Sequence, residues 1–135
     1  MAVARGISAA IVPTAHEDYL RLECSGTFTV DSALETHDRA LALASEAGRP
    51  GVLVDVRALG GREPTIAERY QLAVALADAQ ARMQPRIRFA LLGREPMIHP
   101  ERFGEIVATT RGADVRAFTD EALALDWLLG RAGEP

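Results

Sequence analysis

The feature that most constrains the fold of this chain is a repeated switch between two spacings of apolar residues. In one kind of segment, apolar residues alternate with polar ones or run continuously, which is typical of β-strands. In the other kind they recur every three or four positions, which is typical of amphipathic helices. The strand-like segments are residues 7–13, 19–26, 51–57, 86–93 and 114–118, and the helix-like segments are residues 30–47, 65–83, 100–112 and 119–129.

The order β-β-α-β-α-β-α-β-α predicts an α/β fold with a single mixed, mostly parallel five-stranded sheet. A short polar connection, residues 14–18, joins the first two strands in the manner of antiparallel neighbours. The later strands alternate with helices, and strands connected in this way pair in parallel through right-handed crossovers.

Polar side chains recur on one side of three of the predicted strands, at Arg21, Glu23, Arg86, Arg88 and Arg116. A doubly wound sheet buries both of its faces, so its strands are apolar throughout. We therefore predict that the helices lie mainly on one face of the sheet and that the other face is largely exposed to solvent.

Length and composition fit one globular domain, residues 1–135, in which 48% of residues are hydrophobic and 25% are charged. The formal net charge of −4 gives no general attraction to nucleic acid or anionic lipid. The only cysteine, Cys24, lies in an alternating strand and is expected to be a small buried residue. The apolar run at residues 7–13 is too short to span a bilayer, so we expect no signal peptide and a cytoplasmic protein.

A glycine-rich corner after the third strand is the candidate functional site. The carboxyl ends of parallel strands meet at one edge of a sheet, so this corner should lie beside the loop that follows the fourth strand. Helix N-termini at that edge offer free N–H groups to a small anion, a phosphate or an acidic side chain of a partner. The alternative is that the glycines form a turn and that Thr65, which has capping-box spacing with Glu68, only caps a helix. The candidate binding residues are Arg57, Gly60, Gly61, Arg62, Thr65 and Arg94.

The sequence contains no recognisable catalytic or metal-binding set. His16, His37 and His99 fall in three different elements, without the short spacing of metal ligands. Asp55 and His99 are candidates for a hydrolase, but no nucleophile with a histidine partner accompanies them. Asp55 is alternatively the ion-pair partner of Arg57. We therefore expect a non-enzymatic protein that uses no metal and no cofactor.

Nearly the whole chain resembles the STAS domains, named after sulphate transporters and anti-sigma-factor antagonists, and in particular their small stand-alone bacterial members. The segments that carry the resemblance are "LECSGTFTVDSALE", "VLVDVRAL", "RFALLG" and "FGEIVATTRGADVRAFTDEALALDWL". The resemblance implies strands roughly in sequence order, with the first strand antiparallel at the edge and with helices on one side of the sheet.

The resemblance also implies a function, that of a non-enzymatic regulatory or binding module. In the regulatory branch a serine at the start of the helix after the central strand is phosphorylated and switches partner binding. The corresponding place here is residues 60–68, where Glu63 is followed by Pro64 and the nearest hydroxyl belongs to Thr65. The alternative implied by related STAS-like proteins is a carrier or sensor of a small nonpolar or lipid-like ligand, sheltered between the second and third helices and the sheet, with association at a membrane surface.

Two kinds of partner follow from these expectations. One is a protein or a small ligand, anionic or nonpolar, and the other is a second copy of the chain. An exposed edge strand at residues 7–13 favours pairing between two copies. Nucleic acid is not an expected partner, because no stacking aromatic residues accompany the arginines of the strands.

Overall fold

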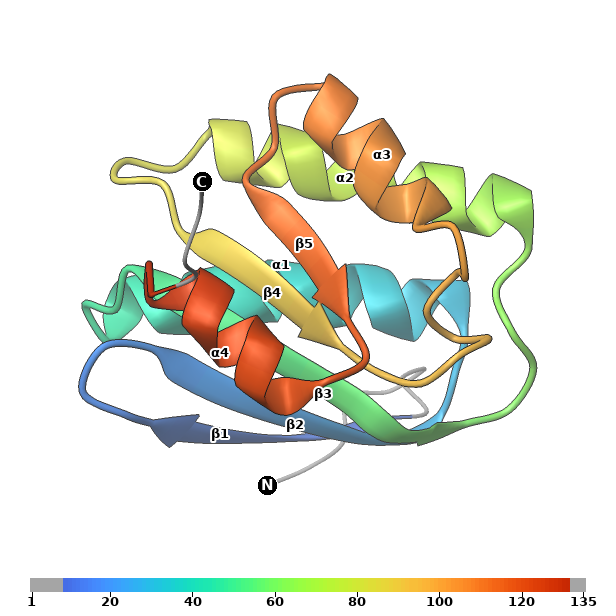
Figure 1. The fold of residues 1–135 in the computed structure, drawn as a ribbon, viewed down its shortest axis with the longest axis horizontal. Helices are drawn as coiled ribbons and strands as arrows, with labels where there is room; N and C mark the ends of the chain where they lie inside the picture. Colours follow the sequence, from blue (N-terminus) through green and yellow to red (C-terminus); the bar gives the residue numbers. More distant parts are fainter. Residues whose placement is uncertain (1–8, 132–135) are drawn as a thin grey trace.

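The computed structural model describes residues 9–131 and has the predicted order of elements (Figure 1). The five strands form one sheet in the order β1-β2-β3-β4-β5, in which β1 is antiparallel to β2 and the other neighbours are parallel. The predicted fold class is therefore confirmed. The elements are β1 (Ala9–Ala15), β2 (Leu20–Thr27), α1 (Val30–Glu46), β3 (Gly51–Gly60), α2 (Ile66–Ala81), β4 (Arg88–Leu92), α3 (Phe103–Thr110), β5 (Val115–Phe118) and α4 (Glu121–Leu128). The first two residues of the predicted strand 7–13 lie outside the described part.

The main core lies between the sheet and α1, α2 and α3. The inward positions of β2 are Leu20, Leu22 and Cys24, which are at most 4% exposed, as their alternation with polar residues predicts. Phe89 of β4 is fully buried in the same layer. Cys24 is a free cysteine with a buried side chain, in agreement with its predicted role as a small core residue. Alanines of the helices, Ala40, Ala44, Ala73 and Ala108, complete this cluster and allow the helices to approach the strands closely.

The opposite face of the sheet is not as exposed as predicted, because α4 packs against it (Figure 1). Ala124 and Leu128 of α4 cover Leu53, Ala90 and Leu92, all of which are buried. Of the four helices within residues 9–131, three still lie on the first face. The expectation of a largely solvent-exposed second face is therefore wrong for β3 and β4 and holds only at the two edges of the sheet, toward β1 and at Arg116 of β5.

Two of the arginines predicted to lie on the exposed face, Arg88 and Arg21, contact residues of α4. Arg88 stacks over the Trp127 ring at 4.4 Å and donates from Nη1 to the Trp127 carbonyl at 2.8 Å. Arg21 has a side chain that is only 12% exposed, because it pairs with carboxylates of β3 and α4. Arg116, on the edge strand β5, remains exposed.

Two element boundaries differ from the prediction near the candidate site. β3 continues to Gly60 instead of ending at Arg57, because its last residues pair with β2 up to Thr27. α3 begins at Phe103 instead of Pro100. His99 Nδ1 accepts the backbone N–H of Glu101, and this local bond favours a turn over the helix. Among residues 9–131, no helix is long and apolar enough to cross a membrane.

Candidate functional site

The glycine corner at the end of β3 is tightly packed. Gly60 is the last residue of the strand, and its carbonyl accepts the N–H of Phe28 at 2.9 Å. Gly61 has φ +96, and a Cβ atom there would lie 2.9 Å from Cγ2 of Thr27. Both the backbone conformation and the space at Gly61 therefore require glycine.

Thr65 and Glu68 form the predicted capping box at the start of α2. Thr65 Oγ1 accepts the N–H of Glu68 at 3.1 Å, and Glu68 Oε1 accepts the N–H of Thr65 at 3.0 Å. Arg62 donates from Nη1 and Nη2 to the two carboxylate oxygens of Glu68, each at 2.7 Å. The side-chain hydrogen bond from Arg62, followed by the backbone bond from Thr65, lowers the pKa of Glu68 from 4.5 to about 2. The guanidinium predicted to attract an external anion thus already holds an internal carboxylate.

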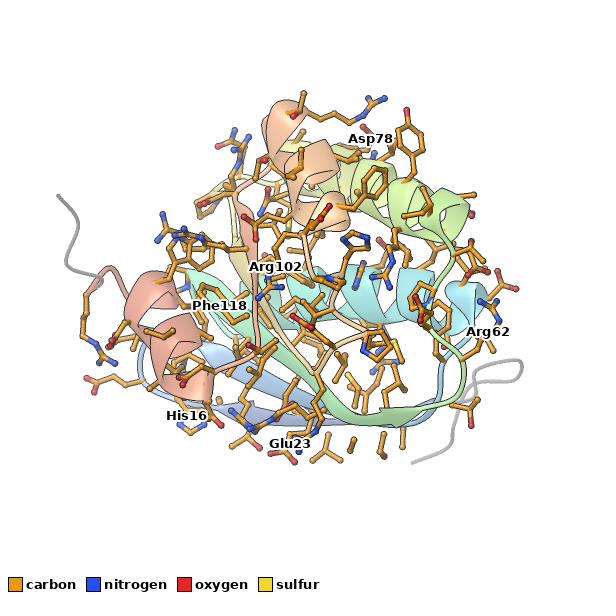
Figure 2. All side chains as sticks on the ribbon, turned by 45° about the vertical axis from the view of Figure 1, so that its right-hand side comes forward. His16, Glu23, Arg62, Asp78, Arg102 and Phe118 are labelled. Atoms are coloured by element: carbon orange, nitrogen blue, oxygen red, sulfur yellow. The ribbon has the colours of Figure 1, made fainter. Side chains whose placement is uncertain are left out.

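Arg57 and Arg94 lie on the other side of the corner, toward the face covered by α4. They line an open hollow of about 340 Å³ together with Arg21, Glu23 and Asp55. Figure 2 shows Glu23 well apart from Arg62. The predicted residues thus fall into two groups, with Arg57 and Arg94 in the hollow and Gly61, Arg62 and Thr65 at the start of α2.

A network of charges connects β2, β3 and α4 beneath this hollow. Asp55 Oδ2 accepts from Arg21 Nη2 at 2.7 Å and from Arg57 Nη2 at 2.8 Å, while its Oδ1 accepts from the Arg57 backbone N–H and Nε, each at 3.0 Å. Glu121 of α4 accepts from Arg21 Nη1 at 2.7 Å and from Arg57 Nη2 at 2.9 Å. The guanidinium of Arg94 has no hydrogen bond or ion pair with another residue of the described chain, whereas its backbone carbonyl accepts the N–H of Ile98 at 2.9 Å.

The same network bears on the two hydrolase candidates. Burial by itself would raise the pKa of Asp55, but the hydrogen bonds from Arg57 and the charges of Arg57 and Arg21 lower it below its usual value. Both of its oxygens are engaged by arginines, so the carboxylate is poorly placed to accept a proton from a substrate. His99 Nδ1 accepts backbone N–H groups of Glu101 and Phe103 at 3.1 and 3.4 Å, which is a helix-start role. No group of three potential metal ligands exists within residues 9–131.

A cavity of about 130 Å³ lies between the sheet and α1, α2 and α3, and we call it the helix cavity. A small nonpolar ligand is expected between the second and third helices and the sheet. The helix cavity lies there and also reaches α1. The cavity exists because small residues on the three helices do not fill the space above the sheet. The helical periodicity of the sequence alone does not reveal such a cavity. The walls include Ala33, His37, Leu72, Ala73, Ile98 and Ala108.

Comparison with known proteins bears on the fold. No family model matches the sequence, and no curated protein matches it either. The crystal structure of an anti-sigma factor antagonist from Mycobacterium paratuberculosis is similar, with a TM-score of 0.59 and 12% identity over 94% of this chain and 99% of that chain. A Shewanella loihica protein described as having a SpoIIAA-like fold gives a TM-score of 0.49 and 18% identity over 95% of this chain and 99% of its own. The chain therefore has the STAS-like fold of an anti-sigma factor antagonist.

Proposed function

We propose that the protein is a non-enzymatic regulatory module that binds a protein partner through residues 60–70, the partner surface. The main support is the exposure of large apolar side chains directly after the glycine corner. Ile66 and Tyr70 are 52% and 47% exposed and lie one helical turn apart on α2. Ile106 on the neighbouring α3 is 56% exposed. The two neighbouring exposed apolar side chains on α2, Ile66 and Tyr70, favour a protein interface there.

Thr65 is the proposed site of regulation on this surface. It is exposed, and it caps the N-terminus of α2, where a phosphate group is electrostatically favourable. A phosphate on Thr65 would bring further acceptor oxygens and negative charge to the first turn of α2, repel the Glu68 carboxylate and compete for Arg62. Modification would therefore rearrange the first turn of α2 next to Ile66.

Affinity capture with matched variants tests the partner surface. The bait proteins are the wild type, Ile66→Asp and Leu123→Asp. Leu123 is 59% exposed on α4, outside the partner surface, so it is a control for the loss of an exposed apolar side chain. We expect the wild type and Leu123→Asp to capture the same protein from the source cells, and we expect Ile66→Asp not to capture it. Loss from neither variant, or from both, would contradict the proposal, provided that circular dichroism shows both to be folded.

A second candidate function is the binding of a small nonpolar ligand in the helix cavity. The observation that favours it is the cavity itself, which is bounded mainly by apolar side chains. Native mass spectrometry of freshly purified protein tests this function, with a co-purified mass of a small molecule as the expected result. Pairing of two copies through the edge strand β1 also stays a prediction, and sedimentation at several concentrations measures it.

A further inference from the structure

We propose that the helix cavity selects a compact, neutral molecule with an apolar body and one hydroxyl group, and that His37 binds the hydroxyl. This inference rests on the second candidate function above. It adds the size, the charge and the single polar group of the ligand.

The cavity is partly open, so its volume sets the size of the part of a ligand that it can enclose. An apolar cavity of about 150 Å³ accommodates a benzene molecule, and the helix cavity has about 130 Å³. A single six-membered ring or an equally small aliphatic body therefore fits. A complete fatty acyl chain is several times larger and would extend out of the cavity.

The charged side chains that border the cavity are engaged by the protein itself. Arg69 donates to the carbonyls of Pro96 and Met97 at 2.6 and 2.9 Å, although it is only 7% exposed. Glu105 accepts the N–H of Ala117 at 2.9 Å. A charged ligand would have to compete with these bonds in an apolar environment, so the cavity favours a neutral molecule.

His37 of α1 is a polar residue of the cavity wall whose ring is not hydrogen-bonded by the protein in the described chain. Neither ring nitrogen has a hydrogen-bond partner among residues 9–131, but Nδ1 is enclosed by the protein, so Nε2 is the nitrogen that a ligand can reach. The ring borders the cavity and packs edge-on against Phe89, with ring centroids 5.2 Å apart. The imidazole is held by this packing, while its Nε2 has no partner in the described chain.

The hydroxyl group follows from the protonation state of His37. Burial lowers the pKa of His37 from 6.5 to about 4, so the ring is neutral at pH 7 and has one donor and one acceptor nitrogen. A hydroxyl both donates and accepts, and it therefore matches either tautomer. An ether or a carbonyl only accepts and so matches only one tautomer, and a hydrocarbon leaves Nε2 unpaired, which a polar site discriminates against.

Benzyl alcohol and toluene form the matched pair of probes, because they differ only in the hydroxyl group. Their dissociation constants are measured by amide chemical-shift titration for the wild type, His37→Leu and His16→Leu. His16 is exposed and stacks on Tyr19, so it is the control histidine. For each variant we take the ratio of the two dissociation constants. A substitution that changes the size of the cavity alters both constants alike, and the solubilities of the probes are the same for every variant, so neither changes the comparison of this ratio between variants. We expect the preference for benzyl alcohol over toluene to fall about fivefold in His37→Leu and to stay unchanged in His16→Leu.

The outcomes separate the two levels of the proposal. If both probes shift cavity residues but His37→Leu leaves the preference unchanged, the role of His37 is wrong and a nonpolar-ligand function stands. If neither probe binds, or if the cavity-filling variant Ala73→Leu binds both as the wild type does, both ideas are wrong. Should His37→Leu fail to fold, His37→Phe is measured in its place, because its ring retains the packing against Phe89.

Discussion

At the scale of single residues, the backbone conformation of Gly61 sets the approach to the partner surface. Gly61 and Gly112 have almost the same φ, +96 and +91, but their surroundings differ. A Cβ at Gly61 would lie 2.9 Å from the Thr27 side chain and 3.3 Å from the Phe28 nitrogen, whereas a Cβ at Gly112 meets nothing within 4 Å. This pair separates backbone strain from steric overlap.

We expect Gly112→Ala to lower the free energy of unfolding by about 1 kcal/mol through strain at positive φ. Gly61→Ala should cost a further ~1–2 kcal/mol, because the added methyl group displaces Thr27 or the backbone of Phe28. Urea denaturation of the two variants and the wild type measures both values. Equal losses in the two variants would show that the corner has room for a side chain.

Thr65 stabilises the protein through its hydroxyl whatever its role in regulation. Thr65→Ala removes the acceptor for the Glu68 N–H and should lower the free energy of unfolding by about 1 kcal/mol. Thr65→Ser keeps the acceptor and should have nearly wild-type stability. Thermal or urea denaturation of the pair checks this, and equal stability of the Ala and Ser variants would contradict it.

At the scale of elements, α4 is what makes the second face of the sheet a packed layer. Gly51, the first residue of β3, lies directly beneath it. A Cβ on Gly51 would come within 2.8 Å of Leu128 Cδ1, so the glycine permits the close approach of the helix to the strand. Leu128 is only 7% exposed at this contact.

A double-mutant cycle on Gly51 and Leu128 tests the packing of α4. Gly51→Ala should destabilise the protein by about 1 kcal/mol through overlap with Leu128, and Leu128→Ala by about 2–4 kcal/mol through the lost burial. In the Leu128→Ala background the cost of Gly51→Ala should disappear, a coupling of about 1 kcal/mol. Additive effects in urea denaturation would mean that the two residues do not touch.

At the scale of the whole molecule, charges connect elements that are far apart in the sequence. Arg21 of β2, Asp55 and Arg57 of β3 and Glu121 of α4 form one network. At the start of α2 a second ion pair, Arg62 with Glu68, is formed locally. Both networks depend on ionised carboxylates, so the stability of the molecule depends on pH.

The carboxylates predict a loss of stability in acid. The pKa of Glu68 falls from 4.5 to about 2 on folding, and that of Asp55 also falls, from 3.8. Stabilisation from such groups is complete above their unfolded pKa values and disappears as the pH falls through the folded ones, here from about pH 5 to pH 2. Asp55→Asn should cost about 2 kcal/mol at pH 7 and flatten this dependence, because Arg21 and Arg57 lose their shared partner.

The control for the carboxylate prediction is Glu17→Gln, which alters an exposed residue with no ion pair in the described chain. Urea denaturation at several pH values measures the dependence. The same pH profile for Asp55→Asn and the wild type would contradict the role of Asp55.

The lowered pKa of His37 predicts a second loss of stability, which begins at a higher pH than the loss from the carboxylates. Its pKa falls from 6.5 to about 4 on folding, so the unfolded chain binds a proton at this residue before the native protein does. The free energy of unfolding should therefore begin to decrease below about pH 6.5 and continue to decrease to about pH 4. His37→Leu should remove this contribution and leave the loss from the carboxylates, which begins at about pH 5. A slope in this range that His37→Leu does not change would contradict the burial of the neutral ring.

The order of the elements, the inward faces of the strands and the capping box of Thr65 and Glu68 could be predicted from the sequence. These features depend on the spacing of residues within one segment, which local backbone geometry translates directly into a face or a cap. The carboxyl-edge location of the glycine corner also followed, because parallel strands bring their loops to one edge. The extension of β3 to Gly60 did not follow, since its last pairs are made with β2.

Only the tertiary structure decided which charges meet and which faces are covered. Arg57 was predicted as a ligand-binding cation, but Glu121, which belongs to α4, shares it with Asp55. The side of the sheet to which α4 returns is set by the packing of Leu128 on β3, and the helix cavity by how three helices pack against one sheet. Contacts of this kind depend on residues far apart in the chain, so no spacing within a segment encodes them.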